Sequence, residues 1–446
     1  MSSKQILIKK SKEIIEASKL KCHEAEISDS LWIEQIQMYI DTCIYIKNTL
    51  NNQQLMNDNQ FISAYIFIIL GGILGNSYTT CKLHSNNQLI TLIQDIFNIY
   101  LIKFNVKTIR QLLLIKVDPL AKFNTSPSLA SEILKVSLLY LAKKCDKSTN
   151  GNDDDDEDSA LTHYPLIRDT IVWLTIELDY PEISEHEFIS ILQPFGLRLT
   201  EDYRSSIQLA GLNVLYNLGN KARIADWRQS NRAEAVISQL LNHRIACTSN
   251  SSEILLHKLY STLLVLTNLL SNTNSANWYE KITERLLFDL LMETRYKRQL
   301  VLLKHLLKLI DILKASFSLF TRQFIKVTSS ILLGPRKITR NGKSVTTNES
   351  NEYDTVYMVM LQCVNEFVKS CWPLICPTLL LDIIPPLIAF IDLLSWDNKV
   401  EIEEDETCSL LKNLFESLII LEPRLLNDVL QPLCETIPHL KLYLPS

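Results

Sequence analysis

The sequence predicts an all-α fold in which antiparallel helix pairs are stacked in series, and three observations support this prediction. Apolar residues recur at intervals of three and four along almost the whole chain, which is the pattern of amphipathic helices. Only nine of the 446 residues are glycine, against about 7% in average proteins, so the glycine-dependent turns of β-sheet folds are scarce. Polar breaks rich in asparagine separate the apolar stretches at helix-length intervals.

This period places individual helices. The clearest cover residues 30–50, 130–145, 276–294 and 296–314, and a very short turn joins the last two. Helices joined by short turns are antiparallel neighbours. Stacked in series, such pairs form a HEAT-like α-solenoid with about 40 residues per repeat. A compact helical bundle is the alternative, but a single core rarely grows beyond about 250–300 residues, so the length favours the solenoid.

One strongly apolar stretch raises the question of a membrane segment. Residues 61–75, FISAYIFIILGGILG, contain no charge. A helix needs about 20 apolar residues to span a bilayer, and this stretch is shorter. We therefore expect a fully buried core helix here, and no membrane partner.

Charge divides the chain into portions. The formal net charge is −5, but the run DDDDED within residues 146–160 supplies six negative charges, and the remainder is nearly neutral. A neutral body offers no broad basic surface, so we expect no nucleic-acid partner. Residues 146–160 are expected to form an acidic disordered loop between N-terminal repeats (1–145) and C-terminal repeats (161–446). Whether these portions are separate domains or one superhelix stays open.

A second polar segment, residues 334–352, is expected to be a loop carrying basic residues, namely Arg336, Lys337, Arg340 and Lys343. A further basic stripe, Lys297, Lys304 and Lys308 with Asp311 beside it, falls on one face of the helix at 296–314. A solvated outer face is the expected role of this stripe, in preference to a phosphate-binding groove.

The sequence contains no catalytic constellation. GPRKITRNGKS at 334–344 ends like a phosphate-binding loop, but its two glycines are too far apart for that motif. HEFIS at 186–190 begins like a zincin helix, but Ser190 occupies the position of the second histidine. No Cys-x-x-Cys pair is present, and the ten cysteines are typical of buried free thiols in a reducing compartment. We therefore predict no catalytic, cofactor-binding or metal-binding residues, and no cofactor.

The densest polar cluster, IADWRQSNRAEAVISQLL at 224–241, has an architectural explanation. Gly219 is expected to end the preceding helix with a positive φ. Asp226 can then cap a short helical turn in which Trp227 faces the core. Asn231 and Glu234 have the spacing of a capping box ahead of the next helix, where the asparagine side chain bonds the amide of the third helical residue.

Residues 370–390, SCWPLICPTLLLDIIPPLIAF, place prolines within a leucine-rich run. Pro373 should end the helix that precedes it, because the residue before a proline avoids the helical region. Pro385 and Pro386 should kink or break the next helix. Packing explains these residues without a partner, but Trp372, Pro373, Pro385 and Pro386 are also the candidate partner-binding residues, since a kinked stack can open a groove.

Several segments resemble the central signature of the Tti-two family. EDYRSSIQLAGLNVLYNL at 201–218, followed by ADWRQSNRAEAVISQLLNH at 225–243, matches an acidic-acidic-Tyr step, a Gly-x-x-x-Leu helix and an Asp-Trp-Arg-x-x-Asn step. The matching positions are Glu201, Asp202, Tyr203, Gly211, Leu215, Asp226, Arg228, Asn231 and Arg232. The helix pair at 277–314 and the Trp-Pro segment at 371–388 also resemble the family, so the likeness covers roughly residues 200–396.

The resemblance implies a non-enzymatic HEAT-repeat scaffold, one of three subunits of the TTT (Triple T) co-chaperone complex. Its implied partners are the Tti-one and telomere-maintenance-two subunits. With the Hsp90 system, that complex serves the maturation and stability of phosphatidylinositol-3-kinase-related kinases, including TOR and the DNA-damage checkpoint kinases. Together with the free thiols, this implies a cytoplasmic and nuclear location. The alternatives are a karyopherin- or adaptin-like transport scaffold and, third, an enzyme with a divergent helical fold.

Overall fold

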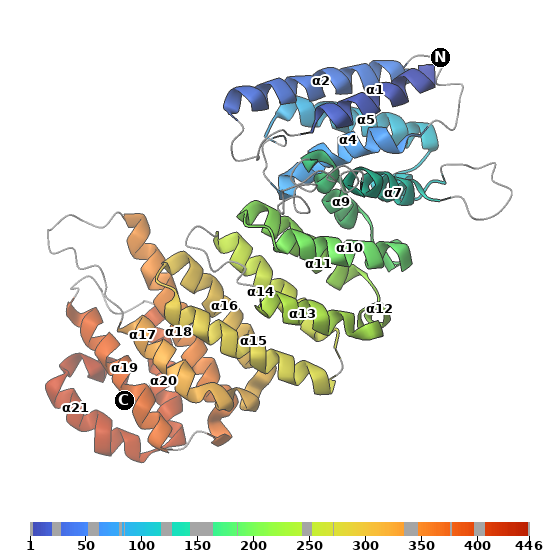
Figure 1. Cartoon of the computed structure of the whole chain (residues 1–446). Helices are drawn as coiled ribbons and strands as arrows, with labels where there is room; N and C mark the ends of the chain where they lie inside the picture. The colour runs from blue at the N-terminus through green and yellow to red at the C-terminus, as the bar shows by residue number, and fades with distance from the viewer. Residues whose placement is uncertain are drawn as a thin grey trace, which may run out of the picture. The chain divides into compact units, whose positions relative to one another are not determined.

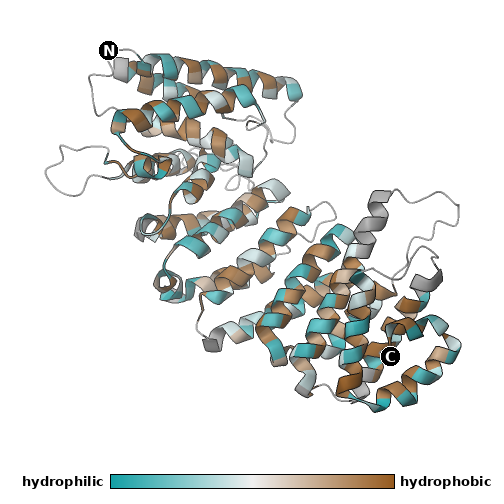
Figure 2. Cartoon of the chain, turned by 180° about the vertical axis from the view of Figure 1, so that it is seen from behind, coloured by the Kyte–Doolittle hydropathy of each residue, from teal (hydrophilic) through white to brown (hydrophobic). Residues whose placement is uncertain are grey.

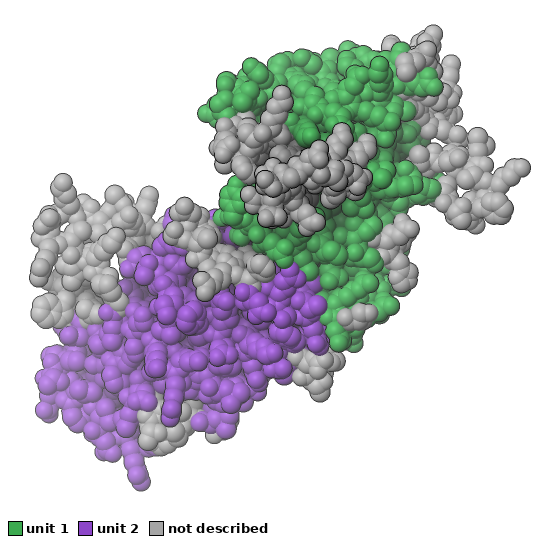
Figure 3. Space-filling view, viewed as in Figure 1, with its two compact units in different colours: residues 1–232 green, residues 233–446 purple. Residues whose placement is uncertain are grey.

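The computed structural model describes residues 3–19, 28–51, 62–79, 83, 85–116, 127–142, 164–184, 186–242, 252–270, 272–333, 347–374, 377–396 and 406–444. Helices account for almost all of these residues (Figure 1), and the only β-type pairing among them is an isolated bridge between Lys116 and Ser128. The chain divides into two compact units, unit 1 (residues 1–232) and unit 2 (residues 233–446), as Figure 3 shows.

Unit 1 is built from helices that pack against partners before and after them in the chain. Its α-helices are α1 (Ser3–Ala17), α2 (Asp29–Asn51), α4 (Ala64–Gly75), α5 (Asn87–Phe104), α6 (Ile109–Leu113), α7 (Leu129–Ala142), α9 (Pro165–Glu177), α10 (His186–Thr200), α11 (Ser205–Lys221) and α12 (Ile224–Arg228). Short 3-10 segments are η2 (Asn76–Tyr78), η3 (Glu182–Ser184) and η4 (Gln229–Asn231).

The closest packing in unit 1 joins α4 to α9, and glycines make it possible. A methyl group on Gly71 would overlap the Trp173 ring, and one on Gly75 would overlap the Asp169 carbonyl oxygen. The two backbones can therefore approach only because these positions lack a Cβ. Thr170 donates its hydroxyl hydrogen bond to the Ile68 carbonyl oxygen (2.7 Å), across the same contact. The uncharged stretch at 61–75 is thus a buried core helix, as predicted.

Unit 2 shows the two-layer arrangement of a solenoid most directly. Its elements are α13 (Arg232–Asn242), α14 (Glu253–Asn268), α15 (Asn272–Met292), α16 (Tyr296–Leu313), η5 (Lys314–Phe320), α17 (Thr321–Leu332), α18 (Thr347–Cys371), η6 (Trp372–Leu374), α19 (Pro377–Trp396), α20 (Glu406–Leu421), η7 (Leu426–Leu430), α21 (Gln431–Thr436) and η8 (Pro438–Tyr443). Helices α14, α16, α18 and α20 pack in sequence as one layer, and α15, α17 and α19 as the other.

Helices α14 and α15, α15 and α16, and α17 and α18 also pack as consecutive neighbours. This alternation is the packing of stacked antiparallel pairs. Figure 2 shows hydrophilic and hydrophobic residues alternating around these helices, as amphipathic helices between two layers require. The predicted all-α, HEAT-like α-solenoid is confirmed.

The acidic stretch does not separate two packing units. Residues 146–160 lie outside the described residues, but α7 before them and α9 after them pack against each other and against α4. A charge run therefore marks a polar connection within unit 1. The division between the compact units falls between residues 232 and 233, within the polar cluster.

The helices of unit 2 correct two expectations, one about the polar loop at 334–352 and one about a helix break at Pro385-Pro386. The expected polar loop at 334–352 is shorter, because α18 begins at Thr347; residues 334–346 lie outside the described residues. The Pro385-Pro386 pair does not break its helix, since α19 runs from Pro377 to Trp396 with both prolines inside. The carbonyl groups of Leu381 and Asp382, which lose their helical donors to these prolines, belong to exposed residues and can bond water.

No helix among the described residues is both long enough and apolar enough to cross a bilayer.

Candidate functional site

The polar cluster at 224–241 is architectural, but its contacts differ from those expected. Gly219 does not end α11, which continues to Lys221 and is followed by Ala222 in an extended conformation. Asp226 lies inside α12, where Arg223 is the N-cap, and its carboxylate pairs with the Arg223 side chain at 3.2 Å. Trp227 is fully buried, as predicted, and donates its indole hydrogen bond to the Leu218 carbonyl oxygen at the end of α11 (3.2 Å).

Asn231 does not have the backbone conformation of an N-cap residue. Its φ is +53°, whereas N-cap residues lie in the extended region. Glu234 does lie in the first turn of α13, where a carboxylate is favourable beside the helix N-terminus. Asn231 therefore has a left-handed conformation, which asparagine tolerates better than other non-glycine residues.

This conformation gives a testable prediction. Asn231→Ala is expected to lower the free energy of unfolding by about 1 kcal/mol, because alanine is strained at positive φ. Asn231→Gly is expected to change it by less than about 0.5 kcal/mol, because glycine adopts this conformation freely. Urea denaturation followed by circular dichroism measures both. Equal losses in the two variants would mean that the asparagine side chain makes the stabilising contact, as in a capping box.

Two other positions of the 201–232 signature, Asp202 and Gly211, also shape the backbone. The Asp202 carboxylate accepts hydrogen bonds from the backbone amide of Arg204 (2.8 Å) and from its guanidinium (2.7 Å), which fixes the turn between α10 and α11. A methyl group on Gly211 would lie 2.6 Å from the Gly196 carbonyl oxygen, so this glycine permits the close α10–α11 crossing. Asp202 and Gly211 thus stabilise a helix pair and its connection.

Trp372 and the prolines lie at the end of α18 and along α19. The α-helix ends at Cys371, close to where Pro373 predicted it, and Trp372 begins η6 with 58% of its surface exposed. Pro385 is exposed and Pro386 is buried. Segment η6 packs against η5, where Leu319 is also exposed, as is Leu374 of η6. We call Leu319, Trp372 and Leu374 the η5–η6 apolar patch.

A histidine pair that sequence spacing did not indicate lies between α14 and α16. His305 Nε2 and His257 Nδ1 are 3.1 Å apart. Burial, together with the charges of His257 and Lys308, lowers the pKa of His305 to about 3, so this histidine is neutral at physiological pH. Among the described residues, no group of three or more His, Cys, Asp or Glu side chains could hold a metal ion. Lys297, Lys304 and Lys308 are exposed, in agreement with a solvated face.

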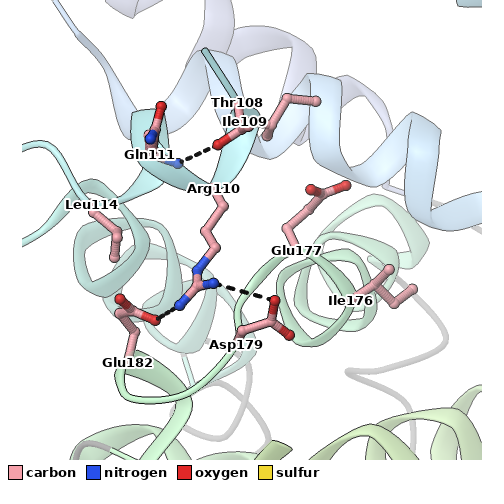
Figure 4. Close-up of a pocket in the computed structure, with 9 residues that line it drawn as sticks. All are labelled: Thr108, Ile109, Arg110, Gln111, Leu114, Ile176, Glu177, Asp179 and Glu182. Carbon is pink, nitrogen blue, oxygen red and sulfur yellow. Dashed lines mark hydrogen bonds and ion pairs between the residues drawn. The ribbon is translucent and has the colours of Figure 1, made fainter. Parts of the chain in front are cut away.

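Unit 1 contains a groove of about 730 Å³ between α6 and the segment that follows α9 (Figure 4). Arg110 of α6 lies at its centre. One guanidinium nitrogen, Nη2, lies 2.6 Å from the Glu182 carboxylate and donates to the Tyr180 carbonyl oxygen (2.7 Å). The other, Nη1, is 3.4 Å from the Asp179 carboxylate. Arg110 therefore fixes the 179–182 segment against α6.

Lys221 of α11 holds the other side of the same segment. Its ammonium donates to the carbonyl oxygens of Ile176 (2.5 Å) and Leu178 (2.8 Å), at the C-terminus of α9, and lies 3.2 Å from the Asp179 carboxylate. A cation at this end of a helix is favourable, because the last carbonyl groups carry partial negative charge. The groove is thus held in shape by two cations from two different helices.

Comparison of the sequence with protein-family models and with curated proteins finds no match. Among solved structures, the chain is similar to yeast importin-beta (Kap95p), with a TM-score of 0.44 and 11% identity over 97% of this chain and 55% of that one. It is also similar to a chain in a structure of Kap95p binding to RanGDP, with a TM-score of 0.48 and 12% identity over 96% and 53%. The chain spans about half the length of these solved chains. Because the TM-scores are below 0.5, the fold described above rests on this chain's own helices.

Proposed function

We propose that this chain is a non-enzymatic scaffold, and specifically the subunit of the TTT complex to which its 200–396 region is similar. In that role it would bind the Tti-one subunit and, with the telomere-maintenance-two subunit and the Hsp90 system, serve the maturation of phosphatidylinositol-3-kinase-related kinases. Two features support a scaffold. The chain is built from stacked helix pairs, and residues of its densest polar cluster, Asp226 and Trp227, make contacts at helix ends.

The observation that carries the partner-binding part is the exposure of Trp372. A tryptophan in the interior of a helical repeat is expected to be buried, as Trp173 and Trp227 are here. Trp372 instead lies at the surface within the η5–η6 apolar patch. Tryptophan is the residue type most enriched among those that dominate binding energy at protein interfaces. We therefore place the Tti-one contact of the proposed complex at this patch.

Trp372→Ala is expected to weaken co-purification with the Tti-one protein at least tenfold, because interface anchors of this kind contribute about 2 kcal/mol or more. The thermal midpoint should change little, since the side chain is mostly exposed. Ile254→Ala, which removes a similarly exposed apolar side chain from α14, is the matched control. A point variant is preferable to truncation near residue 365, because truncation would remove Phe367 and Val368 from the core of α18.

Purification of the wild-type chain from cells, followed by mass spectrometry, tests the identity of the complex. Recovery of the Tti-one and telomere-maintenance-two subunits with Hsp90 cofactors supports the proposal. Recovery of transport factors in their place would favour the karyopherin- or adaptin-like alternative. Full binding of Tti-one by Trp372→Ala would move the contact to another surface.

A further inference from the structure

The groove between α6 and the 176–182 segment of unit 1 carries more negative charge than the cation inside it neutralises. Three of its residues are acidic, namely Glu177, Asp179 and Glu182, and Arg110 is the cation that lines it. The Arg110 guanidinium is already shared between Asp179 and Glu182. The charge of Arg110 therefore does not neutralise the third carboxylate.

Glu177 is that third carboxylate, and it forms no ion pair with any residue that the structure describes. The Lys221 ammonium is nearby but is bonded to carbonyl oxygens at the end of α9 and to Asp179. Burial raises the pKa of Glu177 above its ordinary value, and the Trp173 indole and the Lys221 charge only partly oppose this. Figure 4 shows the Glu177 side chain pointing toward Ile109 and away from the Arg110 guanidinium.

The surroundings of Glu177 suit a long side chain with a positive end. Ile109 of α6 and Ile176 of α9 line the groove on either side of it, and Leu114 lines the α6 side further along. Apolar walls accommodate the methylene stem of an arginine or lysine while its charged end meets a carboxylate. The C-terminal carbonyl groups of α9 add partial negative charge at the same place. An anionic ligand would be repelled by the Glu177 carboxylate and by these carbonyl groups.

We propose that this groove binds an arginine or lysine side chain presented by an extended segment of a partner protein, with Glu177 as the receptor for its charge. A volume of about 730 Å³ is within the range of sites that enclose ligands larger than one side chain, so neighbouring residues of the segment also fit. This site lies in unit 1 and does not depend on the identity of the complex proposed above.

The test uses the full-length chain with isotope-labelled isoleucine methyl groups and the peptide acetyl-Leu-Arg-Leu-amide as the probe. The Ile109 and Ile176 methyl signals are expected to shift saturably, while that of the buried Ile66, outside the groove, stays in place. Replacing arginine in the peptide by citrulline, which keeps the shape and removes the charge, is expected to weaken binding roughly tenfold or more, since hydrogen bonds to charged groups are the stronger ones.

Glu177→Gln should weaken binding of the arginine peptide to the same extent, and Glu34→Gln, an exposed carboxylate on α2, should leave it unchanged. Equal affinity for the arginine and citrulline peptides would overturn the proposal, as would unchanged binding by Glu177→Gln. The absence of any saturable shift would also overturn it. Because the citrulline comparison uses the wild-type chain, it stands even if Glu177→Gln folds poorly, and no outcome bears on Tti-one binding.

Discussion

Arg168→Met is expected to lower the free energy of unfolding by about 3–5 kcal/mol, the range observed when one partner of a buried ion pair is removed. Arg168 and Asp169 of α9 are 0% and 1% exposed, and Arg168 Nη2 lies 2.8 Å from the Asp169 carboxylate. Asn76 and Thr79 donate further hydrogen bonds to the same carboxylate, each at 3.0 Å. Methionine keeps the volume of the arginine stem but leaves a buried charge without its cation.

Urea denaturation followed by circular dichroism measures this loss. Adding Asp169→Asn to Arg168→Met is expected to cost less than the two separate losses combined, because the double variant contains neither charge of the pair. Arg322→Met, an exposed arginine on α17, is the control and should change stability by less than about 0.5 kcal/mol. A loss below about 1 kcal/mol in Arg168→Met would mean that water or other groups solvate Asp169 in the folded chain.

Gly75→Ala is expected to cost about 3 kcal/mol or more, at the upper end of the range for overpacked cores. The added methyl group would overlap the Asp169 carbonyl oxygen, which is backbone and can move only if α4 and α9 separate. That separation would also disturb the hydrogen bond from Thr170 to the Ile68 carbonyl oxygen. The thermal midpoint and the urea midpoint should both fall.

Gly196→Ala is the matched control, because it adds the same methyl group to a buried glycine in a helix. Its nearest neighbours would be side-chain atoms of Leu215 and Val214 at 3.0 and 3.1 Å, and side chains can shift. Alanine also favours the helix over glycine by about 1 kcal/mol. We expect a change close to zero. Equal losses of stability in Gly75→Ala and Gly196→Ala would mean that the contact with the Asp169 backbone does not decide the cost of the added methyl group.

The helices could be predicted from the sequence because their signal is local. The apolar period placed helices at 276–294 and 296–314, and the structure has α15 at Asn272–Met292 and α16 at Tyr296–Leu313. The core position of residues 61–75 was likewise predictable, since a stretch without charge that is too short to span a bilayer is stable only when it is buried in the protein. The sequence did not show which helix would cover the glycines of α4, because their partners on α9 lie about a hundred residues away in the chain.

The groove could not be predicted for the same reason. Arg110 meets Asp179 and Glu182 across 69 and 72 residues, and none of the three belongs to a motif with a fixed spacing. The histidine pair, 48 residues apart, is a similar case. The capping prediction at Asn231 failed differently. Asparagine favours both the N-cap position and the left-handed conformation, and the spacing to Glu234 could not distinguish the two.

The contact between α4 and α9 has a consequence for synthesis of the chain on the ribosome. Ile68 and Thr170, which bond across this contact, are 102 residues apart, and translation adds about 5–20 residues per second. The apolar surface of α4, which α9 covers in the finished fold, is therefore left without that cover for on the order of 5–20 s after α4 has been made. During this interval the nascent N-terminal helices are a natural substrate for general chaperones. Slowing translation between α4 and α9 would lengthen that exposure and favour aggregation of the incomplete chain.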